Sequence, residues 1–147
     1  MSELADLLER YRRGAELLAV ATTGAAGPEL DFKPDGKWSV RQIVCHLADS
    51  EAVAVMRFRQ FIAEDNPSFG TWDQDAWAAK LGYEKRKISQ ALETFRMLRL
   101  GNYELLRDQP LYRISSPLTI SAASGLEVGP ESPGVGGGRS AAAIRFE

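Results

Sequence analysis

The stretch from Trp38 to about Glu64 constrains the fold more than any other part of the chain. Ser39 can accept a hydrogen bond from an orphan amide of a first helical turn, and Gln42 stands three residues later, where a capping box places Glu or Gln. Apolar residues then recur every three or four positions: Val40, Ile43, Val44, Leu47, Ala54, Phe58, Phe61 and Ile62. This pattern predicts a long amphipathic helix from about Val40 to about Glu64.

Two other segments show the same one-sided spacing. The first runs from Ser2 to about Ala21, with apolar positions Leu4, Leu7, Leu8, Tyr11, Ala15 and Leu18. The second runs from about Arg86 to Asp108, with apolar positions Ile88, Leu92, Phe95, Leu98, Leu105 and Leu106. Asp73 is placed to cap a short helix between the long ones. The sequence therefore predicts an all-α, up-and-down bundle, an architecture that usually closes with a fourth helix.

The composition excludes several classes of protein. The chain has 147 residues and a formal net charge of −2, which predicts one domain without the basic face of a nucleic-acid-binding protein. No apolar run approaches the roughly 20 residues that a membrane span requires. The single cysteine excludes an internal disulfide and is typical of a reducing compartment. Because the N-terminus does not resemble a signal peptide, we expect a cytoplasmic location.

The composition changes from Gln109 onward. Gly, Pro and Ser become frequent, and the run Gly136–Gly138 is the extreme case. Chain of this kind cannot bury enough apolar surface to offset the entropy lost on ordering. We therefore expect a helical domain over residues 1–120 and an atypical, irregular or disordered tail over residues 121–147.

The block from Pro34 to Glu51 resembles the signature of the DinB/YfiT-like superfamily. It reads Pro-Asp-Gly-Lys-Trp-Ser-Val-Arg-Gln-Ile-Val-Cys-His-Leu-Ala-Asp-Ser-Glu, and further matches are Arg57, Asp73–Trp77, Phe95 and Arg99. The resemblance covers residues 2 to about 120. It implies a four-helix bundle, often a dimer, with the chemistry of a metal-dependent hydrolase or a thiol S-transferase acting on a small-molecule substrate.

The resemblance also implies a divalent metal, Zn or Ni, bound by three histidines. One family ligand falls on His46, and the other two form a His-x-x-x-His pair on the fourth helix. This chain has one histidine in total, so two of the three ligands are missing. Asp49, three residues after His46, is a secondary candidate ligand. Agreement with the family ends near Ser121. A shift of the reading frame would produce such an abrupt end. Translation of the other two reading frames tests this hypothesis.

Two residues near His46, Glu51 and Cys45, have alternative interpretations. Glu51 occupies a position where the helix pattern calls for an apolar group. It is either a general base acting on metal-bound water or, the preferred interpretation, a structural residue that pairs with an arginine across the bundle or bonds to a helix terminus. Candidate partners are Arg57, Arg96 and Arg99. Cys45 points about 100° away from His46, which excludes a thiolate–imidazole pair and predicts a small buried hydrophobe.

Two functions from different classes follow. The first is an impaired metal-dependent enzyme with the ion, if retained, at His46. The second is a catalytically inactive bundle that acts as a dimerisation or binding module. An incomplete fourth helix would leave an apolar groove open for a partner helix or a second copy of the chain.

Overall fold

The structure of this protein is a computed structural model that describes residues 3–110. Helices are the only regular elements in that part of the chain, which confirms the all-α prediction. The elements are α1 (Glu3–Thr22), α2 (Gly27–Asp31), α3 (Val40–Ala63), α4 (Gln74–Lys80), the 3₁₀ turn η1 (Tyr83–Lys85) and α5 (Ile88–Arg107). Over these residues, no helix is both long and apolar enough to cross a membrane. The predicted tail and the domain boundary near residue 120 lie outside the described residues.

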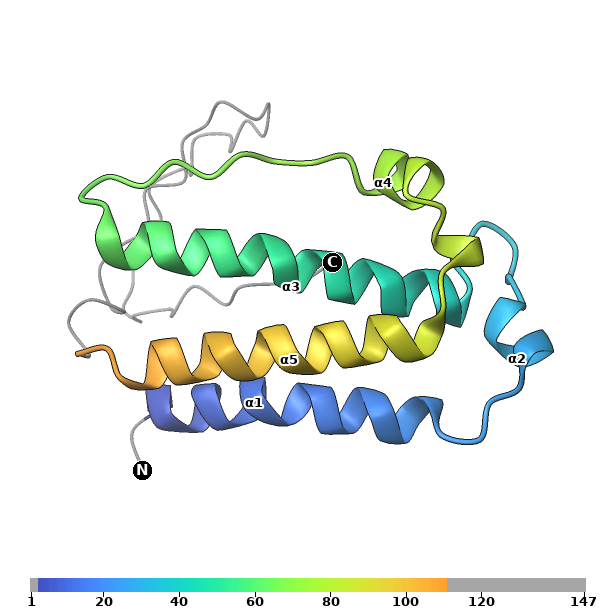
Figure 1. Ribbon diagram of the computed structural model, residues 1–147, viewed down its shortest axis with the longest axis horizontal. Coiled ribbons are helices and arrows are strands. Elements are labelled where there is room, and N and C mark those ends of the chain that lie inside the picture. Colours follow the sequence, from blue (N-terminus) through green and yellow to red (C-terminus); the bar gives the residue numbers. More distant parts are fainter. Residues whose placement is uncertain (1–2, 111–147) are drawn as a thin grey trace, which may run out of the picture.

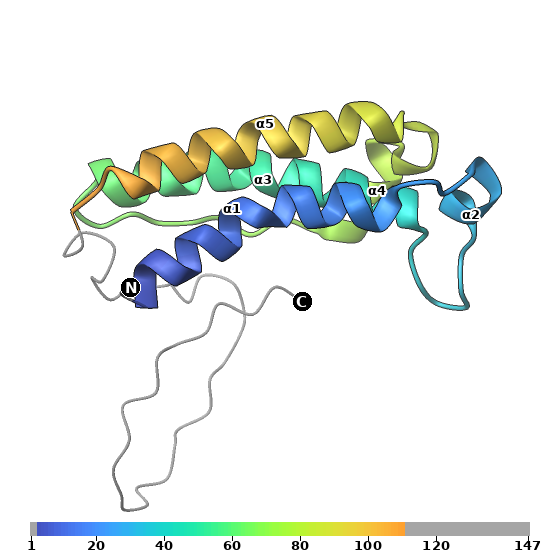
Figure 2. The same cartoon turned by 90° about the horizontal axis from the view of Figure 1, so that it is seen from below.

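Helices α1 and α3 both pack on α5. Helix α5 lies between α1 and α3 and contacts both (Figure 1). Figure 2 shows the same layer from below, with α1 and α3 on one side of α5. This arrangement gives α3 two faces, one packed on α5 and one turned away from it.

The connection from α3 to α5 is a crossover. Figure 1 shows that these two helices run in the same direction. The connection between them is therefore longer than the short turn that joins antiparallel neighbours in an up-and-down bundle. Helix α3 has 24 residues, which makes it about 36 Å long. The ten residues from 64 to 73 can span about 33–36 Å when extended, enough to return the chain along α3 to α4. The returning segment lies on the side of α3 away from α5 (Figure 1).

The core lies between α3 and α5 at the end where α4 and η1 close the bundle. Its buried members are Val44, Cys45, Ala48, Ala78, Tyr83, Ala91 and Phe95. Several of these side chains are small, which lets the two helices approach closely and bury the phenyl ring of Phe95. Cys45 is 0% exposed, in agreement with its prediction as a small buried hydrophobe. Helix α1 contributes no fully buried side chain.

The long helices begin and end within two residues of their predicted bounds. The capping box of α3 is present: Ser39 Oγ accepts from the amide of Gln42 at 3.2 Å, and Gln42 Oε1 accepts from the amide of Ser39 at 3.0 Å. Helix α2 lies between the first two long helices, in a segment for which the apolar spacing predicts no helix. Its first turn contains a proline, and the Glu29 carboxylate accepts from the Ala26 amide at 2.7 Å, which together explain why this short segment is helical.

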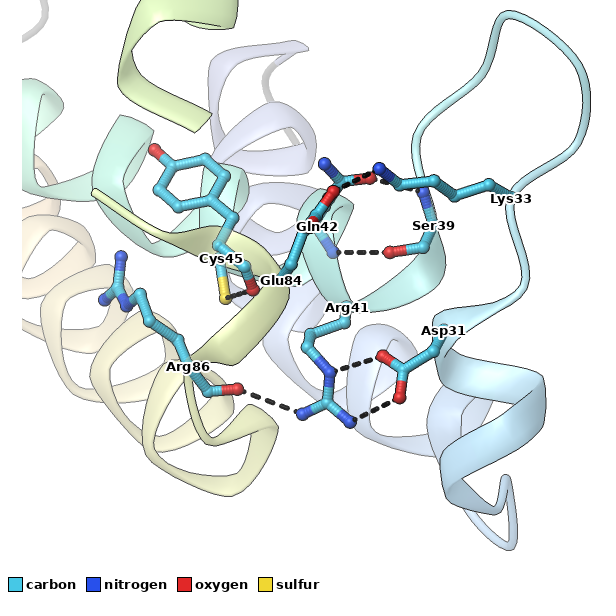
Figure 3. A network of polar contacts seen from close by, with 9 residues as sticks. Asp31, Lys33, Ser39, Arg41, Gln42, Cys45, Glu84 and Arg86 are labelled. Atoms are coloured by element: carbon cyan, nitrogen blue, oxygen red, sulfur yellow. Dashed lines mark hydrogen bonds and ion pairs between the residues drawn. The ribbon is translucent and has the colours of Figure 1, made fainter. Parts of the chain in front are cut away.

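Polar contacts fix the first turns of α3 to the neighbouring connections (Figure 3). The Arg41 guanidinium donates to both carboxylate oxygens of Asp31, at 2.6 and 3.2 Å, and to the carbonyl oxygen of Arg86 at 3.0 Å. The Cys45 sulfur lies 3.7 Å from the Tyr83 carbonyl oxygen. These bonds hold α2 and η1 against the start of α3, where His46 lies.

Candidate functional site

His46 is half-buried on the second turn of α3. Its ring lies edge-on to Trp38, with ring centroids 5.1 Å apart, and its Nε2 is 3.3 Å from Ser50 Oγ. Its Nδ1 is buried without a hydrogen-bond partner among residues 3–110. Burial lowers the pKa of His46, an effect that the nearby Asp49 carboxylate opposes. The imidazole is therefore neutral at pH 7, the form that binds a metal ion.

Asp49 lies one turn further along α3 and is held by an arginine. Both carboxylate oxygens lie close to Arg86 Nη1, at 3.0 and 2.9 Å. Tyr83 is buried nearby, and burial and then the Asp49 carboxylate raise the pKa of its phenol. Asp49 thus already has a cationic partner, and a second cation would have to compete with Arg86.

Glu51 lies on the opposite side of α3, between all three long helices, and is 3% exposed. Its Oε2 accepts from Arg99 Nη2 at 2.8 Å and from Arg99 Nε at 3.1 Å. Its Oε1 accepts from Asn102 Nδ2 at 2.9 Å and from the hydroxyl of Tyr11. Burial and the carboxylate raise the pKa of Tyr11. The geometry is that of a buried ion pair joining α1, α3 and α5.

Of the three arginines predicted as partners of Glu51, the structure brings Arg99 to it. Arg57 instead donates to the Gly70 carbonyl oxygen, and Arg96 pairs with Glu93 on the surface of α5. The Arg99 guanidinium lies over the rings of Tyr11 and Phe95, with centroid distances of 4.4 and 4.3 Å. Arg99 also passes so close to Gly14 that a side chain there would collide with its guanidinium.

Sequence reasoning missed Tyr11 and Asn102 as members of this cluster. A signal for Asn102 was present, because it follows the buried Phe95 by seven residues and precedes the buried Leu106 by four. An amide at such a position needs a hydrogen-bond partner inside the bundle. Tyr11 carried no comparable signal, since a tyrosine on an apolar helix face is also explained by packing alone.

The donors present do not complete a metal site. The Nδ1 of His46 could serve as one ligand in the tautomer that leaves this nitrogen unprotonated. No group of three His, Cys, Asp or Glu side chains placed to hold a metal ion occurs in the described part of the chain. Asp49 is engaged by Arg86 and Glu51 by Arg99, and the sequence offers no second histidine. The residues described fit a single metal ligand, fewer than the three of a catalytic zinc centre.

Comparison with known proteins identifies the family. A family description of the DinB superfamily matches residues 8–132, more than half of the chain. The chain belongs to the DinB superfamily. YfiT from Bacillus subtilis, whose solved structure is described as that of "a probable metal-dependent hydrolase with an unusual four-helix bundle topology", superposes on this chain with a TM-score of 0.72. The two are 26% identical, and the match covers 77% of this chain and 66% of that one.

Curated relatives match over shorter stretches. The protein named "Putative metal-dependent hydrolase YfiT" from Bacillus subtilis is 43% identical over 44 residues, which is 30% of this chain and 25% of that protein. A relative from Bacillus licheniformis with the same type of name is 42% identical over 77 residues, 52% of this chain and 44% of that one. The chain thus spans between a quarter and a half of the length of these two curated relatives. The comparisons support the DinB resemblance and the four-helix class of fold.

Proposed function

We propose that this chain is a DinB-superfamily protein of the metal-dependent hydrolase class in which His46 is the metal ligand on α3 and hydrolytic activity is impaired. The observation that carries the ligand assignment is the buried, unpartnered Nδ1 of a neutral imidazole. The names of the relatives from two Bacillus species support a metal cofactor for this class.

The impairment follows from the donor set. A histidine alone holds a divalent ion weakly and without fixed geometry, because catalytic zinc sites use three protein ligands and an open position. Asp49 forms an ion pair with Arg86, whose Nη1 lies 2.9 Å from the Asp49 carboxylate. Glu51 is a structural residue in the interior of the bundle, since it accepts hydrogen bonds from three other side chains and is 3% exposed.

Metal retention and ester hydrolysis test this proposal together. The full chain and His46→Ala are dialysed against Zn²⁺ or Ni²⁺, analysed for bound metal, and assayed with an activated acetate ester, with and without an added thiol. We expect less than one ion per chain, still less in His46→Ala, and no hydrolysis that depends on His46. Stoichiometric metal with His46-dependent turnover contradicts the impairment, whereas equal metal in both proteins contradicts the ligand assignment.

A second candidate function is a binding module that pairs two copies of the chain. The observation in its favour is the exposure of large apolar side chains on α1, where Leu7 is 51%, Leu17 60% and Val20 73% exposed. Exposed apolar surface of this kind is commonly covered by a partner. Light scattering at two protein concentrations tests this candidate. A mass that rises toward twice the chain mass supports a homodimer, and a monomer at both concentrations contradicts it.

A further inference from the structure

The face of α3 that is turned away from α5 carries a pocket that Asp49 lines and His46 does not. Its volume is about 490 Å³, within the range typical of small-molecule sites. Six residues of α3 line one side: Asp49, Ala52, Val53, Met56, Arg57 and Gln60. The segment that returns along α3 supplies Phe69 and Gly70, and the α4 region supplies Trp77 and Leu81. Figure 1 shows this returning segment alongside α3.

The walls of the pocket are mostly apolar. Two aromatic rings and several aliphatic side chains face it, and two of these side chains remain open to solvent, Met56 at 59% and Leu81 at 50% exposed. An apolar ligand body would cover this surface and remove it from water, which is favourable by about 25 cal/mol per Å² of apolar area. The walls therefore favour a ligand with a hydrocarbon or aryl body.

The charges at the pocket do not cancel. The Asp49 carboxylate is neutralised by Arg86. Arg57 has no carboxylate partner among residues 3–110: its Nη2 donates to the Gly70 carbonyl oxygen at 2.6 Å, and its guanidinium lies over Trp72 and Phe69. A guanidinium has five N–H donors, and the bond to Gly70 uses one of them. The pocket thus has one positive charge without a counterion on the described part of the chain.

The Arg57 guanidinium is also held in place. The ring of Trp72 lies 5.0 Å and that of Phe69 5.8 Å from its central carbon, and the bond to Gly70 fixes one edge of the fork. An arginine that is already ordered loses less side-chain entropy when it binds a ligand. A planar guanidinium matches a carboxylate in a bidentate pair, which is stronger than a neutral hydrogen bond.

We infer that this pocket binds a small organic carboxylate, with an apolar body against Val53, Met56 and Trp77 and its anionic group on Arg57. The anion position is separate from His46, although Asp49, the secondary candidate ligand, lines the pocket. Arg57 lies eleven residues after His46, about 16 Å along the helix axis, and His46 does not line the pocket. The inference therefore goes beyond the proposed hydrolase function and does not depend on a bound metal.

Octanoate binding to the full chain in EDTA-containing buffer tests the inference. Tryptophan fluorescence is the signal, because Trp77 lines the pocket and Trp72 lies beside Arg57. Octanamide has the same hydrocarbon body without the charge, and acetate has the charge without the body. We expect saturable binding of octanoate and at least about tenfold weaker binding of the other two compounds, since each lacks one of the two contacts.

Arg57→Gln and Arg59→Gln form a matched pair of variants. Both remove one positive charge from α3, but Arg59 is exposed and donates to the carbonyl oxygen of Val55 on its own helix. Octanoate binding is expected to weaken at least about tenfold in Arg57→Gln and to stay unchanged in Arg59→Gln and His46→Ala. Equal affinity for octanoate and octanamide, equal effects of the two arginine variants, or no saturable signal would each overturn the inference.

A second variant guards against a folding defect in Arg57→Gln, which also loses the bond to Gly70. Val53→Phe fills the apolar part of the pocket and leaves Arg57 in place. Calorimetry is expected to show loss of octanoate binding with the helical circular dichroism spectrum retained, and undiminished binding in this variant would contradict the placement of the ligand body. Because every measurement is made without metal, failure of the carboxylate site leaves the His46 proposal standing.

Discussion

Replacing Glu51 with alanine is predicted to lower the free energy of unfolding by about 3 kcal/mol. Breaking a buried ion pair by removing one partner costs about 3–5 kcal/mol, because the remaining charge stays buried without compensation. The lower end applies because the Arg99 side chain is 16% exposed and part of its charge reaches water, whereas Glu51 is 3% exposed. The substitution also leaves the hydroxyl of Tyr11 and the amide of Asn102 without their acceptor.

Two further variants separate the charge from the hydrogen bonds. Glu51→Gln keeps an oxygen for Tyr11 and Asn102 but removes the charge facing Arg99, so a smaller loss of about 1.5–3 kcal/mol is expected. Glu51→Leu combined with Arg99→Met removes both charges and leaves an apolar contact. This double variant is expected to be more stable than Glu51→Ala, because no unpaired charge remains in the bundle.

Urea unfolding followed by far-UV circular dichroism measures these differences. Glu93→Ala is the matched control, since it removes an exposed carboxylate that pairs with Arg96 on α5, where both side chains are more than half exposed. No measurable change is expected there. A Glu51→Ala chain within about 1 kcal/mol of the unmodified chain, or a double variant less stable than Glu51→Ala, would refute the reasoning about this cluster.

Three other predictions follow from α3. Ser39→Ala removes the acceptor for the Gln42 amide and is expected to cost about 1 kcal/mol in a urea melt, whereas an unchanged midpoint contradicts the cap. Cys45 is 0% exposed, and burial raises the pKa of its thiol. Ellman's reagent is therefore expected to react far more slowly with the folded chain than with the chain in urea, and equal rates would contradict this. Burial lowers the pKa of His46 in the folded chain, so the unfolded chain protonates this imidazole at a higher pH. The metal-free protein is therefore expected to lose stability as the pH falls below about 6.5. Thermal melts of the chain and of His46→Gln check this, because the variant should lack that loss.

The long helices could be predicted because their signals are local. The Ser39–Gln42 capping box fixes where α3 begins, and a spacing of three and four residues marks its buried face. The spacing placed the buried face only in part: Val44 is buried, but Val40 and Ile43 are exposed, and the buried face continues through Cys45, Ala48 and Glu51. The direction of α5 relative to α3 could not be predicted in this way, because the crossover depends on how the segment from 64 to 73 packs along α3.

The partners of the polar residues depend on the packing between helices. Sequence reasoning indicated an arginine partner for Glu51, but the choice of Arg99 depends on the register of α5 against α3. The pairing of Asp49 with Arg86 depends on the position of the chain that follows η1. Arg57 was considered as a partner of Glu51, and its place at a pocket became visible only with the returning segment that contributes Phe69 and Gly70.

The most direct test of His46 as the single metal ligand is an NMR titration of ¹⁵N-histidine-labelled chain with Zn²⁺. Because the chain has one histidine, the imidazole signals belong to His46 without further assignment. We predict that the ring nitrogen signals shift and approach saturation only at a large excess of zinc, as a single ligand requires. Saturation at one equivalent would reveal a complete ligand set and contradict the impairment. Signals that do not move at any zinc concentration would contradict the assignment of His46 as a ligand.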